Sequence, residues 1–289
     1  MVWVIPLLLA CLVVFWGYLS SNLIMKIPRY PLEANPKTFG HDFEKFQAKS
    51  QDGVLLDGWF VPAKIKTGTV IFVLHGWGAN RSDILIPTIF LAEHYNLVYF
   101  DFRNHGTSGG SLSSLTCSEV GDFTAVVDRV RQTRPDAARQ MAVFGFSMGA
   151  SAAISGAAAM PDIRAVVAES PFASFNETVV RFANLFYGIP RFVVPVTLMF
   201  VRMRLGFDPE SCAPLYHADK LSPRPLFIIQ GGSDLRMPPS EGQGIYEIAK
   251  EPKDIWVVPG ADHGEASEKG GEEYQKRIIK FYQESLKNP

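Results

Sequence analysis

The sequence lacks an excess of either charge, and this limits the partners that it predicts. Its 289 residues include 28 Lys and Arg against 29 Asp and Glu, which gives a formal net charge of −1 at pH 7. No basic run stands out against this balance, so nothing predicts a nucleic-acid partner. Internal repeats and low-complexity tracts are also lacking, so nothing indicates a repeat architecture or a biased linker.

Cysteine is scarce as well. The chain has only Cys11, Cys117 and Cys212. Their spacing is not that of a metal site, and an odd number without a framework argues against a disulfide scaffold. We therefore predict three ordinary thiols, buried or half-buried, and no metal site.

Charged side chains are absent from residues 1–25, which read MVWVIPLLLACLVVFWGYLSSNLIM. A helix of this length, at about 1.5 Å per residue, crosses a hydrocarbon core of about 30 Å. Trp16 and Tyr18 lie toward one end, where an interfacial aromatic belt is expected. We predict an uncleaved single-span anchor over residues 1–25.

Three other interpretations of this segment are weaker. A cleavable signal peptide would have a basic residue before the apolar run and an A-x-A-like site after it, and neither is present. The stretch LLAC at residues 8–11 resembles a lipoprotein cleavage site, but the apolar run continues beyond Cys11. A buried helix of a globular domain would show a polar face. Lys26, Arg29 and Lys37 follow the span, and this bias predicts a cytoplasmic domain.

Residues 26–50 are predicted to form a linker, and residues 51–289 one domain in which strands and helices alternate. Apolar, β-branched runs of this kind are typical of buried parallel strands with helices on both faces of the sheet. The expected strands span residues 54–62, 68–76, 96–104, 141–146, 165–170, 225–234 and 254–263, and the expected helices 118–134, 149–160, 240–251 and 272–287.

A long insert at residues 172–217 interrupts this alternation. It is apolar and helix-like, with Pro190 and Pro195 as breakers, and excursions of this length often form lids or binding elements. We expect the segment 192–201 either to cover the site or simply to pack on the domain. The candidates for substrate contact are Phe192, Leu198 and Met199, and the flanking basic residues are Arg191, Arg202 and Arg204.

The pattern G-x-S-x-G occurs twice, and it can mark a nucleophilic serine on a sharp turn. In GFSMG, Ser147 follows a predicted buried strand and precedes a helix of small residues, which is the context that the pattern requires. In GTSGG, Ser108 is followed by more glycine and polar residues, which are typical of a loop. We predict Ser147 as the nucleophile, against the simpler interpretation of a small residue in a tight turn.

A serine nucleophile needs a base, and the base needs an acid that holds its orientation. His263 follows the last predicted strand, and Asp234 ends the strand before it. Glu169, at the end of an earlier strand, is the alternative acid. The order Ser147, Asp234, His263 is the one expected for a nucleophile elbow on a parallel sheet. The N–H groups of Met148 and Trp77 are the predicted oxyanion donors.

Taken together, these motifs resemble the α/β-hydrolase superfamily. The resemblance extends over roughly residues 50–285 and is strongest to a branch of membrane-anchored, lysophospholipase-like and depalmitoylase-like esterases with serine aminopeptidase relatives. It rests on the stretches SQDGVLLDGWFVP, VLHGWGAN, DFRNHGTSGG, GFSMGAS, ESPFASF, GGSDLRMPP and VPGADHGE. The resemblance implies a mostly parallel eight-stranded sheet, the triad above and no metal or organic cofactor. Many relatives have a histidine where Gln230 stands, outside the triad.

The sequence supports three functional hypotheses. The first is a membrane-anchored serine hydrolase that cleaves a carboxylic ester or thioester, with a small-molecule or lipid-like acyl substrate. The second keeps the chemistry but cleaves an amide, as a serine amidase or aminopeptidase does. The third is a membrane-bound scaffold that keeps the fold without catalysis. The presence of both glycines of GFSMG and of all three triad residues argues against it.

Overall fold

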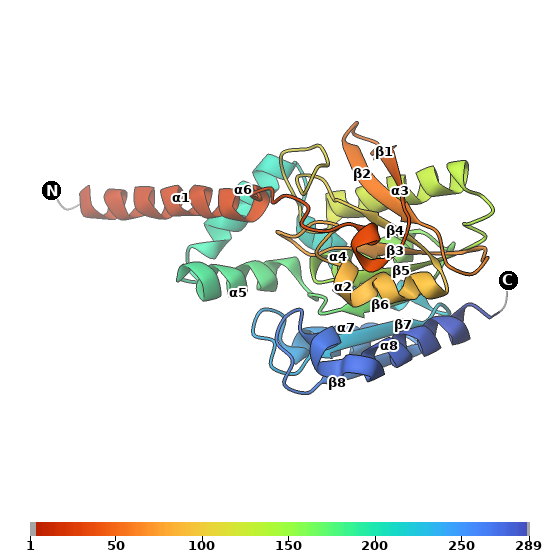
Figure 1. Cartoon of the computed structure of the whole chain (residues 1–289). Helices are drawn as coiled ribbons and strands as arrows, with labels where there is room; N and C mark the ends of the chain where they lie inside the picture. Colours follow the sequence, from red (N-terminus) through yellow and green to blue (C-terminus); the bar gives the residue numbers. More distant parts are fainter. Residues whose placement is uncertain (1–3, 288–289) are drawn as a thin grey trace.

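The computed structural model describes residues 4–287, and its centre is an eight-stranded sheet (Figure 1). The strand order is β1-β2-β4-β3-β5-β6-β7-β8. Strand β2 is antiparallel to both of its neighbours and every other pair is parallel, so the predicted mostly parallel sheet is confirmed. The strands are β1 (Glu44–Lys49), β2 (Leu55–Val61), β3 (Thr69–Leu74), β4 (Asn96–Phe100), β5 (Gln140–Phe146), β6 (Ile163–Glu169), β7 (Leu226–Gly231) and β8 (Lys253–Val258).

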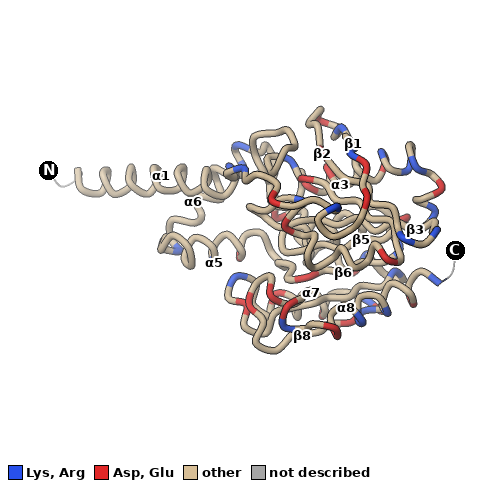
Figure 2. The backbone as a smooth tube through the Cα atoms, viewed as in Figure 1, with Lys and Arg blue, Asp and Glu red and all other residues tan. Residues whose placement is uncertain are grey.

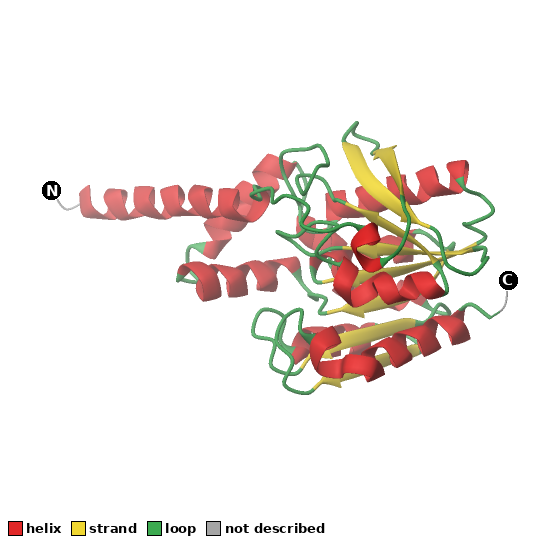
Figure 3. Cartoon of the chain, viewed as in Figure 1, coloured by secondary structure: helices red, strands yellow, loops and turns green. Residues whose placement is uncertain are grey.

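Helices cover both faces of this sheet, as predicted (Figure 3). Strand β3 shows why, because Phe72 packs into the core on one face and Val73 into the core on the other. A strand that is buried on both sides needs apolar residues at every position, and all six residues of β3 are buried. One face carries α3 (Cys117–Thr133), α4 (Met148–Ala159) and α7 (Pro239–Ile248), and the other carries α2 (Leu85–Thr88), η2 (Ile89–Glu93) and α8 (Ala266–Ser285).

The insert between β6 and β7 is helical, as predicted. The Ser174 hydroxyl accepts a hydrogen bond from the Glu177 N–H and so caps the first helix, which ends at Gly188 in the left-handed conformation. Pro195 lies in the first turn of the second helix, where no backbone N–H is required. The elements of the insert are α5 (Phe175–Tyr187), α6 (Val194–Leu205), η3 (Pro209–Cys212), η4 (Pro214–Tyr216) and η5 (Ala218–Leu221).

The N-terminal helix α1 (Val4–Met25) extends away from the domain, and its last turns pack on α6 (Figure 1). Within residues 4–287 it is the one helix that is long and apolar enough to cross a membrane. The carbonyl groups at its end accept hydrogen bonds from the domain, Ile24 from the Trp77 indole and Met25 from the Asn104 amide. The helix is therefore attached directly to the domain.

The predicted linker 26–50 is wrong in its last part. After η1 (Pro36–Phe39), residues 44–49 form strand β1, which pairs with β2. Phe46 and Ala48 are buried, whereas the residues between and before them are exposed. This strand has only two apolar residues, Phe46 and Ala48, among polar ones, because a strand at the edge of the sheet needs only one apolar face. Its signal in the sequence was therefore weak.

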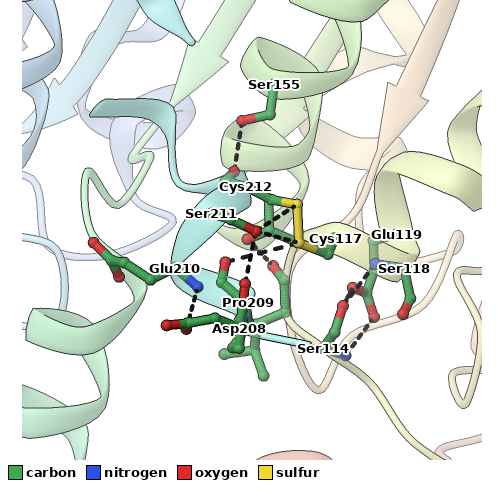
Figure 4. The surroundings of a disulfide bond; sticks show 12 residues. Ser114, Cys117, Ser118, Glu119, Ser155, Asp208, Pro209, Glu210, Ser211 and Cys212 are labelled. Atoms are coloured by element: carbon green, nitrogen blue, oxygen red, sulfur yellow. Dashed lines mark hydrogen bonds between the residues drawn. A yellow bond between two sulfur atoms is a disulfide. The ribbon is translucent and has the colours of Figure 1, made fainter. Parts of the chain in front are cut away.

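The prediction of three free thiols is also wrong. Cys117, at the start of α3, forms a disulfide with Cys212 in η3, and their Cα atoms are 5.3 Å apart (Figure 4). Cys11 is free and exposed on α1. The two bonded cysteines are 95 residues apart in the chain, so only the packing of the insert against α3 brings them together.

Candidate active site

Ser147 occupies a sharp turn between β5 and α4. Its φ of 54° and ψ of −118° lie in a region that non-glycine residues rarely adopt, and such strain persists only where the surroundings impose it. A Cβ atom on Gly145 would lie 2.3 Å from the Gly149 carbonyl oxygen, and one on Gly149 would lie 2.3 Å from that of Leu74. Both glycines are therefore required for the helix to begin this close to the sheet.

The structure brings the three predicted triad side chains together. His263 Nε2 lies 3.1 Å from Ser147 Oγ, and His263 Nδ1 lies 2.7 Å from Asp234 Oδ2. Asp234 follows β7 and His263 follows β8, so the carboxyl ends of three parallel strands supply the cluster. With Nδ1–H donating to the carboxylate, Nε2 is free to accept the serine proton.

The Asp234 carboxylate is almost completely buried and is fully oriented by its neighbours. Its Oδ1 accepts hydrogen bonds from the backbone N–H groups of Arg236 and Met237, at 2.9 and 2.7 Å. Its Oδ2 faces His263. Both oxygens therefore have partners, which is how a buried carboxylate remains favourable and directs the imidazole.

The predicted oxyanion donors lie beside the serine. The N–H of Met148 is at the start of α4, where helix N–H groups have no helical partner and the helix dipole is positive. Gly76, next to Trp77, lies against the side chains of Phe146 and Ser147. In the part of the chain that the structure describes, neither the Met148 nor the Trp77 N–H donates a hydrogen bond. Both are available to a ligand.

Two buried histidines hold the loop that carries Trp77. His75 Nε2 accepts from the Phe102 N–H while its Nδ1–H donates to the Gly76 carbonyl, and His105 Nε2 accepts from the Gly78 N–H. Burial lowers the pKa of His105 to about 4 and the pKa of His75 well below its usual value, so both rings are neutral at pH 7. They position the loop and do not contact Ser147.

A cavity of about 730 Å³ opens beside Ser147 and His263, and it is lined by several aromatic rings together with aliphatic, polar and charged side chains. Helix α5 contributes Phe182 and Phe186, which the sequence analysis missed although their i, i+4 spacing places them on one helix face. The insert does border the site, but through α5. The predicted contacts Phe192, Leu198 and Met199 do not line the cavity, because α6 packs on α1 instead.

The model of one known family matches residues 70–272 of the chain, and that family is described as the alpha/beta hydrolase family. This match covers most of the domain, from β3 into α8. The chain belongs to the alpha/beta hydrolase family.

Relatives of this hydrolase occur in several bacteria. The uncharacterized protein YqkD of Bacillus subtilis is 27% identical over 255 residues, which are 84% of this chain and 83% of YqkD. The uncharacterized protein YfhR of Escherichia coli K12 is 26% identical over 288 residues, 96% of this chain and 93% of YfhR. The names of both relatives assign no activity.

Solved structures of hydrolases share the fold. The esterase Pf2001 of Pyrococcus furiosus is 28% identical, with a TM-score of 0.77 over 91% of this chain and 98% of that one. An acylaminoacyl peptidase of Pyrococcus horikoshii is 19% identical, with a TM-score of 0.65 over 84% of this chain and 42% of that one. The peptidase shares the fold alone, so the esterase carries more weight.

Ser108, the other serine in a G-x-S-x-G pattern of this hydrolase, is a structural residue. Its hydroxyl is buried, donates to the Asp101 carbonyl at 2.6 Å and accepts from the Asp57 N–H at 2.9 Å. Both hydrogen-bonding roles of the hydroxyl are thus used to join the glycine-rich loop to β2 and β4. The pattern alone could not separate the two serines, whereas the strand-to-helix context did.

Glu169, the alternative acid, lies in the wall of the cavity and has another partner. Its carboxylate accepts a hydrogen bond from the Tyr274 hydroxyl at 2.6 Å, and no hydrogen bond joins it to His263 in the described chain. Complete burial, with a smaller contribution from the nearby Asp234 charge, raises the pKa of Glu169 to about 7, against the opposing effect of the Tyr274 hydrogen bond. Asp234 is therefore the carboxylate that orients the base.

Proposed function

We propose that this chain is a membrane-anchored serine hydrolase that cleaves a carboxylic ester or thioester with a hydrophobic acyl group. The observation that carries the proposal is the hydrogen-bonded series from Ser147 through His263 to Asp234, with distances of 3.1 and 2.7 Å. The serine is on a strained elbow, and unused N–H groups lie beside it. Together these are the parts that acyl transfer to serine requires.

The mechanism follows from these positions. Ser147 Oγ attacks the acyl carbonyl carbon while His263 Nε2 takes the hydroxyl proton. The N–H groups of Trp77 and Met148 donate to the oxyanion of the tetrahedral intermediate, and Asp234 stabilises the imidazolium. His263 then protonates the leaving alcohol or thiol as the carbon–oxygen or carbon–sulfur bond breaks. In the second half, His263 takes a proton from water as the water oxygen attacks the acyl carbon. The bond from that carbon to Ser147 Oγ then breaks, His263 returns the proton to Oγ, and the carboxylic acid is released.

The walls of the cavity support an apolar acyl group. Phe90, Phe146, Phe182 and Phe186 line it together with aliphatic residues of the α2 region. Apolar walls with a few convergent polar groups are typical of sites for small organic ligands. The likeness to the esterase of Pyrococcus furiosus supports an ester as the scissile bond.

An aminopeptidase or amidase activity is the second candidate. Asp83 and Glu268 lie at the edge of the cavity, and a carboxylate is what would hold the free amine of a peptide substrate. Matched ester and amide substrates with the same acyl group separate the two. We expect ester hydrolysis to be much faster, and an amide rate equal to the ester rate would favour the peptidase.

A fluorophosphonate probe tests the nucleophile directly. We expect the wild-type protein to be labelled, and Ser147→Ala to lose both labelling and at least about a thousandfold in kcat/KM. Ser108→Ala is the matched control, because it removes the other serine of the same pattern, and it keeps the label. A folded wild-type protein without labelling would reject the enzymatic proposal in favour of a scaffold.

The proposed anchor is α1, whose 22 residues correspond to about 33 Å of helix. The side of the membrane is a separate question. Lys26, Arg29 and Lys37 favour a cytoplasmic domain. The disulfide between Cys117 and Cys212 favours an oxidising compartment. We expect the oxidising side, because the disulfide belongs to the folded domain itself. Digestion of the domain by protease added to sealed, cytoplasmic-side-out vesicles would place it in the cytoplasm.

A further inference from the structure

The orientation of the domain relative to α1 is defined by three hydrogen bonds. The Trp77 indole donates to the Ile24 carbonyl at 3.0 Å, and the Asn104 amide and the Ser113 N–H donate to the Met25 carbonyl at 3.2 and 2.9 Å. The three donors lie in loops that follow β3 and β4, at the carboxyl edge of the sheet. The edge that carries Ser147 therefore faces the direction from which α1 arrives (Figure 1).

The length of α1 determines how close to the bilayer the domain lies. From Val4 to Trp16 nearly all side chains are exposed, and these residues correspond to only about 20 Å of helix. A hydrocarbon core is about 30 Å thick, so a span must also use the part of α1 beyond Trp16. That part packs against α6: Gly17 lies against Val196, and the hydroxyls of Ser20 and Thr197 are 2.6 Å apart.

Helix α6 crosses α1 obliquely at this contact (Figure 1). Both its first turn, at Val196 and Thr197, and its last turn, at Arg204, contact residues 17–21 of α1. The start of α6 and the turn that joins it to α5 lie on the side toward the N-terminal end of α1, as Figure 1 shows. If α1 spans a bilayer, this turn is at the depth of the lipid.

We call residues 185–203 the cap corner, and its surface matches that position. Its exposed apolar residues include Leu185, Tyr187, Phe192, Met199 and Met203, and the side chain of Phe192 is 69% exposed. Single exposed apolar residues are normal on a soluble surface, whereas several within one short segment indicate a partner. Figure 2 shows the corner and α1 as neighbouring stretches with almost no charge.

The two charged residues within the cap corner are Arg191 and Arg202, and each faces a carboxylate outside it. Arg191 is exposed at the turn, with Glu177 4.0 Å away, and Arg202 pairs with Asp208. Arg204 donates to the Ser21 hydroxyl and lies over the Tyr18 ring. Arg204 and Tyr18 thus lie together near the last turn of α6, and basic and aromatic side chains are typical of the boundary between hydrocarbon and headgroups. The long side chain of Arg191, at the turn, can extend toward the headgroups while its stem stays among apolar groups.

The cap corner is continuous with the wall of the catalytic cavity. Phe186 is half exposed and lies in both, and Phe182, one turn earlier on α5, lines the cavity with it. Their ring centroids are 5.1 Å apart. An apolar path therefore leads from the exposed corner toward Ser147.

We infer that the cap corner is immersed in the leaflet that α1 enters, and that the cavity receives its acyl substrate from this leaflet. The inference rests on the proposed function, which supplies both the anchor and the reaction. It specifies the substrate class as an ester or thioester whose acyl chain is dissolved in the bilayer.

A depth measurement tests the position of the corner. In a Cys11→Ser background, the variants Phe192→Cys and Ile65→Cys carry a fluorophore in vesicles of phosphatidylcholine and phosphatidylglycerol. Ile65 is the matched control, because it is also apolar and exposed but lies in the β2–β3 loop at the opposite edge of the sheet. We expect spin-labelled lipid to quench the fluorophore at position 192 and a water-soluble quencher to reach only position 65.

An activity measurement tests the delivery of substrate. We expect Phe192→Glu to lower the hydrolysis of a long-chain ester embedded in vesicles by about tenfold, because a charge in the apolar leaflet opposes immersion. Hydrolysis of a short, soluble ester and fluorophosphonate labelling of Ser147 stay unchanged. Tyr187→Glu, at the end of α5 beside the same turn, has the same effect, and Ile65→Glu, the matched control, changes none of the rates.

The outcomes separate the inference from the proposed function. Equal access of the water-soluble quencher to positions 192 and 65, or an unchanged vesicle rate in both corner variants, overturns the inference while labelling of Ser147 still supports the hydrolase. Two results would overturn the proposed function and the inference with it. One is that the wild-type protein is not labelled, and the other is that alkaline carbonate releases the wild-type protein from membranes.

Discussion

The triad and the cap corner are built in opposite ways. At the triad, each polar atom of Asp234 has a partner, and Ser147 is held in a strained conformation by backbone contacts on both sides. At the corner, side chains such as Phe192 and Met203 are largely exposed and make few specific contacts. The chemistry proposed for Ser147, His263 and Asp234 depends on positions defined to a fraction of an ångström, whereas the proposed lipid contact depends on apolar area. Substitutions at the triad should therefore abolish activity, whereas substitutions at the corner should reduce it by degrees.

The largest effect outside the triad itself is expected at the elbow. In Gly149→Ala the added Cβ would lie 2.3 Å from the Leu74 carbonyl oxygen, and the backbone cannot move away without separating α4 from the sheet. We expect the free energy of unfolding to fall by at least about 4 kcal/mol. Denaturant unfolding followed by circular dichroism measures it.

Gly121→Ala is the matched control for this change. Gly121 lies in α3 with no atom within 4 Å of the added Cβ, so alanine should raise stability by up to about 1 kcal/mol. Similar losses of stability in Gly149→Ala and Gly121→Ala would show that the turn at Ser147 imposes no special constraint.

The disulfide joins the insert that bears the corner to α3, which packs on the sheet that bears the triad. Replacing it in Cys117→Ser/Cys212→Ser releases a constraint between residues 95 positions apart, and we expect a loss of about 2–4 kcal/mol in the free energy of unfolding. Cys11→Ser, which removes the free thiol, is the control and should leave stability unchanged. A loss below about 1 kcal/mol would mean that the bond is not formed in the protein as purified.

A pH-dependent effect is expected at Glu169, in the wall between the two regions. Its pKa is raised from 4.5 to about 7, so between these values the folded state binds more protons than the unfolded state. Stability therefore falls as the pH rises through this window. Glu169→Gln removes the group that titrates and can still accept from Tyr274.

The measurement for Glu169→Gln is the free energy of unfolding relative to the wild type at two pH values. We expect a gain on the order of 2 kcal/mol at pH 8 and a smaller one at pH 5. A gain that is the same at both values, or larger at pH 5, would contradict the assignment.

The smallest effect is expected at the hydrogen bond that connects α1 with the loop after β3, which carries Trp77. Trp77→Phe removes the indole donor to the Ile24 carbonyl but keeps the backbone N–H beside Ser147. We expect a loss of about 1 kcal/mol in stability and less than a threefold change in kcat/KM on a soluble ester. A hundredfold loss of that activity would show that the side chain itself takes part in the reaction.

Much of the catalytic edge could be predicted from the sequence because local signals define it. Only a few backbone arrangements connect a buried strand, a serine between glycines and a helix of small residues. The loops after β7 and β8 reach the carboxyl edge of the sheet, where this serine lies, because these strands are parallel. The positions of Ser147, Asp234 and His263 follow from that. Phe182 and Phe186 were missed, because which face of α5 meets the cavity depends on the packing of the whole insert.

The chain by itself determined the alternation of buried strands and helices, the apolar character of α1 and the identity of the residues at the strand ends. These are properties of neighbouring residues, and hydrophobic period and turn chemistry express them locally. Only the tertiary structure decided the disulfide, the strand within residues 44–49, and the packing of α6 on α1 rather than over the cavity. Each of these joins segments far apart in the chain, where burial of complementary surfaces outweighs any local preference.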